Sequence, residues 1–414
     1  MPSLLQINAT CNWGSTGHIA EQIALSAQEH GWTCYIAHGA RYINESSQKT
    51  YLIGSRFGNI LHVAKSLFLG KHGLGSYRAT QRLVNFIKEV TPDVIHLHNI
   101  HGYYLNYPVL FKYLKESGVP VVWTFHDCWA MTGQCTHFVS ASCERWKSDN
   151  GCDHCPLLGE SYKTYVDRSN KNWQLKKELF TSLDNMTIVP VSHWLEGIVR
   201  ESFLKEKRIY TIYNGVDTNK FVPLESASFS VGKYGLIKNQ YVLGVSTGWS
   251  DKKGYTDYCK LAEKMPAGIK IALLGLDDKK SHEVGQYGIV GIRRTDNIKE
   301  LVELYNGAIA VTSLSYEETF GLTVVEGLAC GVPGIVYNAT ASPELVSSET
   351  GIIVEPGDLG GVAKAIQIIS QNGKQYYSKA CRKRAVILFS KNERCEEYVQ
   401  LYEELLNVNK YDVL

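Results

Sequence analysis

Residues Ser313–Pro333 read SLSYEETFGLTVVEGLACGVP, and this stretch decides how the second half of the chain folds. The apolar run just before it, Ala308–Val311, predicts a short buried strand. Apolar residues then recur with helical spacing over Leu322–Cys330, and the following Gly331 is a typical helix end. The sequence therefore predicts a strand, a turn that carries Glu318, and a helix whose first turn points back at that turn.

The start of this helix is a predicted anion site. The backbone N–H groups of Gly321, Leu322 and Thr323 have no partner inside the helix and lie at the positive end of its dipole, which favours phosphate. Glu326 follows one helical turn later, on the side that faces Glu318. Two carboxylates beside a phosphate site suit a nucleotide sugar, whose sugar and ribose hydroxyls each need an acceptor. An amphipathic helix with an exposed glutamate has the same spacing.

The wider motif resembles the retaining glycosyltransferases of family four, which have the GT-B fold. The likeness rests on Glu318 and Glu326 with Phe320-Gly321 between them, followed by Gly-Leu-Ala-Cys-Gly-Val-Pro. It implies that Glu318 contacts the donor sugar, that Glu326 contacts the ribose, and that Phe320 belongs to the donor site. It also implies an α/β fold class of two Rossmann-like parallel-sheet domains facing a cleft, with a C-terminal helix crossing back to the first domain.

Length and composition agree with a protein of several domains. The chain has 414 residues, which is more than one ordinary core, and 44% of them are hydrophobic. A net charge of +2 does not indicate a nucleic-acid-binding protein. The chain has no run of about 18 apolar residues that could span a membrane, and its first residues do not resemble a signal peptide. Its 11 cysteines therefore favour a cytoplasmic protein with thiols free or bound to metal.

Strand-like and helix-like segments alternate in both halves, which predicts parallel sheets covered on both faces. The turn Asn214–Asp217, with Phe221 after it, resembles the family's entry into the second domain. The predicted domains are an acceptor-side domain at 1–222, a nucleotide-sugar-binding domain at 223–390, and a helix at 391–414 that packs back on the first domain.

Two groups of residues in the first half are predicted to face ligands. Gly14 and Gly17 lie in a loop, Cys11–His18, that lacks the GxGxxG pattern of dinucleotide sites. The family resemblance places this loop near the donor phosphates, and a plain tight turn is the alternative.

His98 and His126 each follow a predicted strand, and parallel strands bind ligands at these ends. The family resemblance gives His126 a catalytic place near the donor sugar. The residues after His98 are acceptor-side candidates, namely His101, Tyr103 and Tyr104. A lone histidine is more often structural.

Breaking a sugar–phosphate bond calls for positive charge at the leaving diphosphate. Lys253-Gly254 matches the family's phosphate-binding Lys-Gly, and we expect Lys253 to act in catalysis. The arginine that the family has a few residues earlier is missing from Val245–Trp249, so Arg293 or Arg294 is expected to supply its charge. The chain has no Asp-x-Asp motif, and we expect no catalytic metal and a front-face displacement.

Residues 128–158 form a cysteine-rich insertion. Its Cys-x2-Cys pair and two upstream cysteines predict a structural zinc site, with His137 or His154 as substitute ligands and Cys128 packed near the active site. Buried free thiols and disulfides are the alternatives. The four candidate ligands are Cys135, Cys143, Cys152 and Cys155.

Residues 46–88 contain no Asp or Glu, and seven basic residues alternate there with apolar clusters. This pattern predicts peripheral contact with the anionic inner face of the cytoplasmic membrane. A solvated face paired with acidic residues elsewhere is the alternative.

Several motifs of the first half resemble, within the family, glycosyltransferases of exopolysaccharide clusters of the colanic-acid type. They are Gly14–Gly17, His96–Asn99 and His126–Trp129. We therefore expect retaining transfer of a hexose from a UDP- or GDP-linked sugar to a lipid-linked oligosaccharide in capsule or exopolysaccharide biosynthesis. A non-catalytic nucleotide-sugar or interaction protein on a degenerate GT-B scaffold is the alternative.

Overall fold

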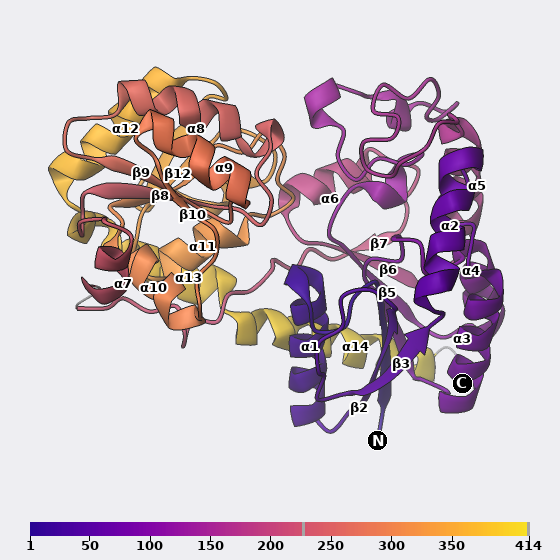
Figure 1. Cartoon of the computed structure of the whole chain (residues 1–414). Coiled ribbons are helices and arrows are strands. Elements are labelled where there is room, and N and C mark those ends of the chain that lie inside the picture. The colour runs from indigo at the N-terminus through magenta and orange to yellow at the C-terminus, as the bar shows by residue number, and fades with distance from the viewer. Residues whose placement is uncertain (226–227, 412–414) are drawn as a thin grey trace. The chain divides into compact units, whose positions relative to one another are not determined.

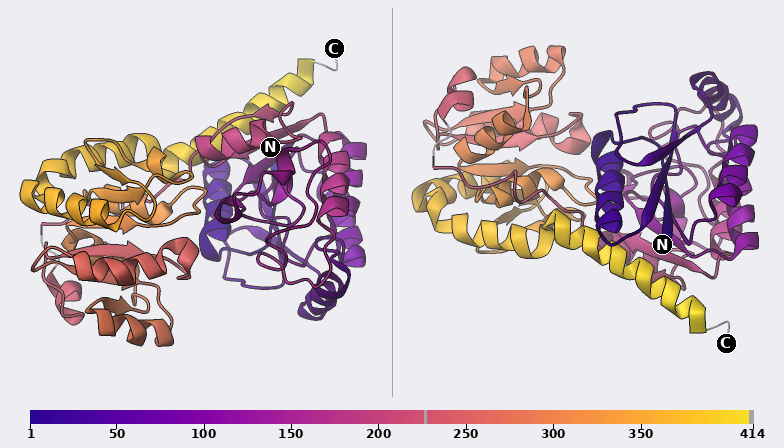
Figure 2. Two further views of the ribbon diagram at one scale, coloured as in Figure 1. Left: turned by 90° about the horizontal axis from the view of Figure 1, so that it is seen from above. Right: turned by 90° about the horizontal axis from the view of Figure 1, so that it is seen from below.

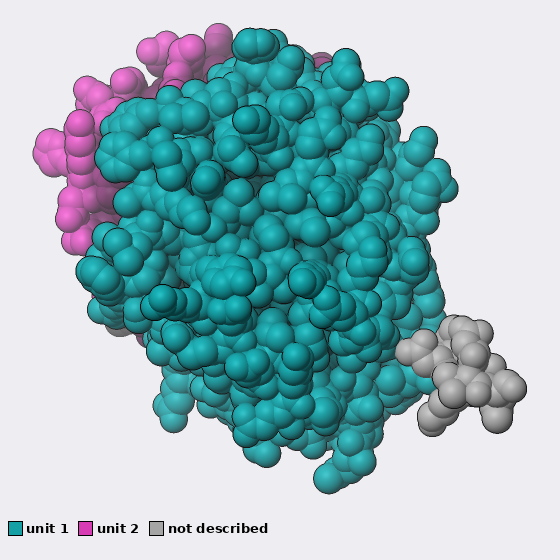
Figure 3. All heavy atoms as spheres, turned by 90° about the vertical axis from the view of Figure 1, so that its right-hand side faces the viewer, with its two compact units in different colours: residues 1–212, 394–414 teal, residues 213–393 magenta. Residues whose placement is uncertain are grey.

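The computed structural model describes residues 1–225 and 228–411, which form two compact units (Figures 1 and 3). Unit 1 holds residues 1–212 and the described residues from 394 onward, and unit 2 holds residues 213–393. The sequence analysis placed its boundaries at 222/223 and 390/391.

Unit 1 is built on seven parallel strands in the order β3-β2-β1-β4-β5-β6-β7. The strands are β1 (Ser3–Asn8), β2 (Thr33–Gly39), β3 (Lys49–Ile53), β4 (Val94–Leu97), β5 (Val121–Phe125), β6 (Met186–Pro190) and β7 (Arg208–Ile209). The helices are α1 (Gly14–Glu29), α2 (Arg56–Leu69), α3 (Tyr77–Val90), α4 (Tyr107–Ser117), α5 (Ser169–Thr181), α6 (His193–Arg200) and α14 (Lys391–Tyr411), which begins in unit 2.

Unit 2 repeats this plan with six parallel strands in the order β10-β9-β8-β11-β12-β13. The strands are β8 (Tyr241–Val245), β9 (Lys270–Leu274), β10 (Val290–Ile292), β11 (Ala310–Ser313), β12 (Gly334–Tyr337) and β13 (Gly351–Val354). The helices are α7 (Ser228–Lys233), α8 (Tyr255–Leu261), α9 (Asp278–Glu283), α10 (Ile298–Gly307), α11 (Leu322–Ala329), α12 (Leu359–Asn372) and α13 (Lys374–Phe389). The two sheets confirm the predicted α/β class.

Central strands of unit 1 are buried on both faces, because helices cover both sides of the sheet. On β5, Trp123 packs with Phe111 of α4 and Phe180 of α5. Its neighbour Val122 points to the opposite face, where it joins a cluster with Ile23 of α1. Successive side chains of β5 thus pack against helices on opposite faces of the sheet.

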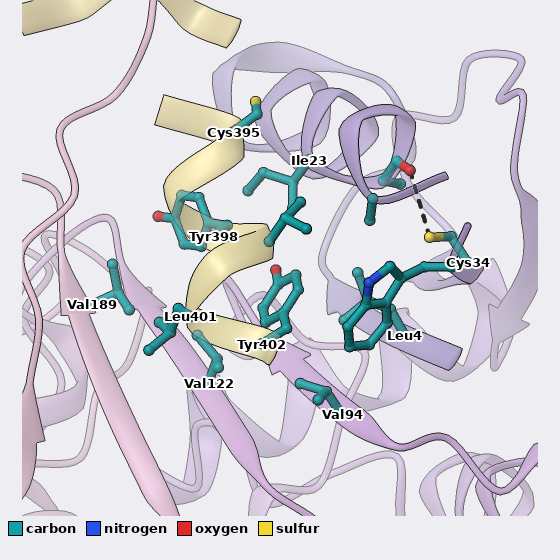
Figure 4. Packing of buried hydrophobic residues seen from close by; sticks show 14 of the residues in the cluster. Leu4, Ile23, Cys34, Val94, Val122, Val189, Cys395, Tyr398, Leu401 and Tyr402 are labelled. Carbon is teal, nitrogen blue, oxygen red and sulfur yellow. Dashed lines mark hydrogen bonds between the residues drawn. The ribbon is translucent and has the colours of Figure 1, made fainter. Parts of the chain in front are cut away.

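Helix α14 completes this second layer, which confirms that the last helix packs on the first domain (Figures 2 and 4). Tyr398 and Tyr402 are buried beside the strands. Thr124 donates a hydrogen bond to the Tyr398 hydroxyl at 3.0 Å, so its oxygen accepts from Nε2 of His96 at 2.8 Å. Nδ1 of His96 therefore accepts from the Tyr402 hydroxyl at 2.6 Å. Burial keeps the pKa of His96 well below its usual value, so the ring is neutral.

Two features of the first half differ from the predicted elements. Strand β3 falls inside the basic segment and was not expected, because as an edge strand it exposes most of its residues and lacks a regular apolar pattern. Helix α1 begins at Gly14, so Gly14 and Gly17 lie in its first turn and not in the preceding loop. The cysteine-rich insertion is irregular, and it contains three short 3-10 turns, at Trp129–Met131, Val139–Ala141 and Arg145–Lys147.

We predict that Tyr402→Phe destabilises the protein by about 1–3 kcal/mol, because the buried Nδ1 of His96 then loses its donor. Denaturant unfolding followed by tryptophan fluorescence measures this change. Tyr376→Phe is the matched control, since Tyr376 is 73% exposed. Equal midpoints for Tyr402→Phe and the wild type would show that the hydrogen-bond chain contributes nothing to stability.

Candidate functional site

The order of strands in unit 2 fixes where a ligand can bind. Strand β8 lies between β9 and β11, and the connections leave it in opposite directions, which makes the carboxyl ends of β8 and β11 the switch point of the sheet. The loops after these two strands touch at Gly254. A Cβ on residue 254 would lie 2.2 Å from the Leu314 carbonyl oxygen, and its φ of 75° also favours glycine.

This close approach brings together Lys253 and Glu318, which the sequence predicted separately at the donor's phosphate and sugar. Nζ of Lys253 lies 2.7 Å from Oε1 of Glu318 and donates to the Glu317 carbonyl oxygen at 3.0 Å. The two side chains remain 30% and 23% exposed, so a ligand can reach both. The N–H of Glu318 donates to Oγ1 of Thr340 at 2.9 Å, which fixes the loop backbone.

Helix α11 begins at Leu322, directly after this loop, as predicted. Gly321 is its N-cap and has a φ of 104°, a conformation that turns the chain sharply into the helix. Gly321, Leu322 and Thr323 are partly exposed and carry the N–H groups of the first turn. Phe320 is only 3% exposed and packs with Tyr213 and Phe389, so its side chain anchors the turn before α11 to the core of unit 2.

Glu326 lies on the same helix and has an unusual environment. Burial raises the pKa of its carboxyl to about 7, and a hydrogen bond from the Tyr305 hydroxyl at 2.7 Å opposes this shift. Tyr305 is fully buried. A carboxyl that is held in place and partly desolvated can accept hydrogen bonds from a ligand with little loss of conformational freedom.

The expected second cation is less well placed. Arg293 and Arg294 are exposed after β10, and β9 separates β10 from β8 in the sheet. Arg293 pairs with Asp278 at 2.7 Å.

In unit 1, His98 and His126 lie next to each other, after the adjacent strands β4 and β5. The Gln6 amide donates to the Ala20 carbonyl oxygen at 2.8 Å, so its Oε1 accepts from Nε2 of His98 at 2.8 Å. Nδ1 of His98 is then an acceptor, and Nε2 of His126 donates to it at 3.2 Å. Burial lowers the pKa of His126 to about 4, so this ring is neutral near pH 7. Sequence reasoning missed Gln6, although a polar residue inside an apolar strand is a recognisable signal.

His101 and Asp127 form a second pair nearby, with Nε2 of His101 2.9 Å from Oδ2 of Asp127. Burial alone would raise the pKa of Asp127, but the His101 charge and hydrogen bond lower it. The Tyr162 hydroxyl contacts Nδ1 of His101. Sequence reasoning missed Tyr162, because it lies in an irregular segment without periodicity.

The two tyrosines predicted on the acceptor side differ in exposure. Tyr103 is partly exposed and packs edge-on against Tyr162. Tyr104 is 1% exposed, and its hydroxyl donates to the Asn99 carbonyl oxygen at 2.7 Å. Tyr104 therefore supports the loop after β4, while Tyr103 can meet a ligand.

The four candidate zinc ligands surround one cavity of about 10 Å³, although none of them is adjacent to another in sequence. Sγ of Cys135 lies 3.8 Å from Sγ of Cys155. As the described residues stand, no three or more His, Cys, Asp or Glu side chains are gathered to hold a metal ion.

Comparison with known proteins places the chain in a family. The model of Glycosyltransferase Family 4 matches residues 20–220, and that of Glycosyl transferases group 1 matches residues 229–385. WcaC of Escherichia coli K12, provisionally named a colanic acid biosynthesis glycosyl transferase, is 23% identical over 97% of this chain and 100% of its own length.

Solved structures agree on the fold. Sucrose-phosphate synthase from Thermosynechococcus elongatus has a TM-score of 0.71 at 17% identity, and the match covers 99% of this chain and 100% of that one. Anabaena HepE in complex with UDP-glucose has a TM-score of 0.65 at 15% identity, and the match covers 98% of this chain and 100% of that one. The chain belongs to glycosyltransferase family 4 and has the GT-B fold.

Proposed function

We propose that this protein transfers a hexose, with retention, from a UDP- or GDP-linked sugar to a lipid-linked oligosaccharide in exopolysaccharide biosynthesis. The observation that carries the proposal is the Lys253–Glu318 pair at the switch point of the unit 2 sheet, directly before the first turn of α11. The name of WcaC supports the polysaccharide product, and the UDP-glucose bound to HepE supports the class of donor.

The Lys253–Glu318 pair suits the diphosphate and the hexose of such a donor, which are joined by the bond that breaks. A diphosphate is anionic and a hexose presents hydroxyls, so neighbouring cationic and carboxylate side chains can bind the two ends of the bond that breaks. Lys253 would neutralise the leaving diphosphate together with the N–H groups of α11, and Glu318 would accept from sugar hydroxyls. In this scheme protein groups carry out phosphate neutralisation without a catalytic metal.

The groups in unit 1 suit a role toward the sugar and the acceptor. His126 is neutral near pH 7 and its orientation is fixed through His98 and Gln6, so it can exchange hydrogen bonds with a hydroxyl without a charge change. His101 with Asp127 can likewise orient an acceptor hydroxyl.

A surface on unit 1 supports access to a lipid-linked acceptor. Helix α2 exposes five large apolar side chains at 49–69% of their area, and we call them the α2 apolar surface: Phe57, Ile60, Leu61, Phe68 and Leu69. Arg56, Arg78 and Arg82 lie exposed on the same segment of chain. Apolar residues flanked by cations suit the interface of an anionic bilayer. In the described part of the chain no helix is long and apolar enough to cross a membrane.

We predict that Glu318→Gln lowers kcat about 100-fold with UDP binding retained, because the lost carboxylate acts on the reacting sugar. Lys253→Ala should lower kcat and also weaken UDP binding. Nucleotide release from UDP- and GDP-sugars and calorimetric titration of UDP measure these effects. Glu355→Gln, at an exposed site after β13, is the matched control. Near-wild-type turnover in both Glu318→Gln and Lys253→Ala would exclude this site.

We predict that Glu326 makes folding stability depend on pH. Its pKa is about 7 in the folded protein and near 4.5 when unfolded, so the unfolded chain loses the proton first and native stability falls as pH rises from about 4.5 to about 7. Glu326→Gln removes this dependence. The melting temperature of the variant minus that of the wild type should therefore rise between about pH 4.5 and about pH 7 and stay constant at higher pH. Thermal scans at several pH values test this, and parallel curves over the whole range would contradict it.

We predict that the protein sediments with anionic vesicles and that binding falls with salt, since each basic side chain near such a surface contributes about 1 kcal/mol. Phe57→Ser with Phe68→Ser should weaken binding, and so should Arg78→Ala with Arg82→Ala. Ile353→Ser, which removes a 44% exposed side chain from unit 2, is the control. Equal binding to neutral vesicles, or none to anionic ones, would contradict membrane docking.

A further inference from the structure

The cysteine-rich insertion brings together four thiols that the proposed transfer reaction does not use. All four thiols line the cavity of about 10 Å³, which can hold about one water molecule or an ion of similar size; they belong to Cys135, Cys143, Cys152 and Cys155. All four thiols are free of disulfides. They lie outside the three short 3-10 turns of a segment that has little regular structure. Convergence of all four on one small cavity is unexpected for cysteines that only fill space.

The sulfur spacing matches one coordination geometry. In a tetrahedral site with Zn–S bonds of about 2.3 Å, neighbouring sulfurs lie about 3.8 Å apart. Sγ of Cys135 and Sγ of Cys155 are 3.8 Å apart, whereas a disulfide would bring them to about 2.0 Å. The Gly133 N–H points at Sγ of Cys152 at 3.3 Å, and such a donor stabilises a thiolate more than a thiol.

A buried lysine lies beside this cavity. Lys176 of α5 is 1% exposed, and its ammonium donates to the carbonyl oxygens of Trp129 at 2.6 Å and Thr132 at 2.9 Å. Thr132 lines the cavity. Burial lowers the pKa of Lys176 well below its usual value, and negative charge on Cys152 and Cys135 would oppose this shift. A zinc ion with four thiolates carries net negative charge, which would offset the cost of burying the cation.

We propose that Cys135, Cys143, Cys152 and Cys155 bind one structural zinc ion as four thiolates. Among the described residues no three such side chains are gathered around a common point, so zinc binding would have to bring the four thiols closer together. The ion would cross-link residues 135–155. Tyr162 follows shortly after this segment and contacts His101, so zinc would also hold the tyrosine against the His101–Asp127 pair.

Metal analysis of protein purified without a chelator and without a histidine tag tests the proposal. We expect about one zinc per chain, released as a thiol reagent modifies four cysteines. Cys→Ser at each of the four positions should lower the zinc content, while Cys259→Ser in unit 2 should leave it unchanged. Because these variants can fail to fold, the wild type is also exchanged with Co²⁺, which should give the visible spectrum of a tetrahedral tetrathiolate.

Three results would overturn the proposal. One is wild-type protein that holds no zinc or cobalt and whose four thiols react equally fast with and without added metal. Another is a disulfide between Cys135 and Cys155 in protein kept under reducing conditions, seen as a mass lower by two hydrogens. Zinc that persists when all four cysteines are replaced would equally exclude these ligands.

Discussion

Unit 1 depends on the burial of one face of its sheet, and the first 212 residues cover that face only in part. Its central strands are buried on both faces, and part of one face is covered by α14, whose residues come from the other end of the chain. Tyr398 and Tyr402 both pack against the strands and satisfy the polar side chains of His96 and Thr124. Unpaired polar groups at that depth would each cost free energy, so the hydrogen bonds and the apolar packing require each other. The sheet, and with it the edge that holds His98 and His126, keeps its shape through this helix.

Both units collect their reactive groups in the same way. Parallel strands end at one edge, and the chain reverses direction there beside a central strand, so loops distant in sequence become neighbours. In unit 2 this juxtaposition yields Lys253 beside Glu318, and only glycine at position 254 allows the approach. In unit 1 the adjacent strands β4 and β5 end side by side and bring His98 next to His126, while an irregular segment brings Tyr162 to His101. The chemistry of the family therefore follows from where strands stop more than from any helix or strand by itself.

The sequence predicted the fold class well because its signals are local and strong. Strand β11 and the two ends of α11 follow from an apolar run, a glycine after the helix and a family motif, whereas the contact between Lys253 and Glu318 was not predicted. Strand β3 escaped prediction because an exposed edge strand has no apolar alternation. Contacts such as Gln6 with His98, or Tyr162 with His101, depend on long-range packing that periodicity does not report. Burial also distinguished Tyr104 from Tyr103, which look alike in sequence.

The late position of α14 has a consequence for how the protein is made. A ribosome synthesises residues 1–212 long before residues 394–402. When the strands of unit 1 emerge, Val94, Val122 and Val189 are therefore not yet covered by α14. Unit 2 is synthesised during this interval. It can form its own core at that stage, since all of its residues, 213–393, come before the part of α14 that belongs to unit 1. The apolar face that α14 covers in the finished unit therefore stays exposed on the nascent chain while unit 2 is being made.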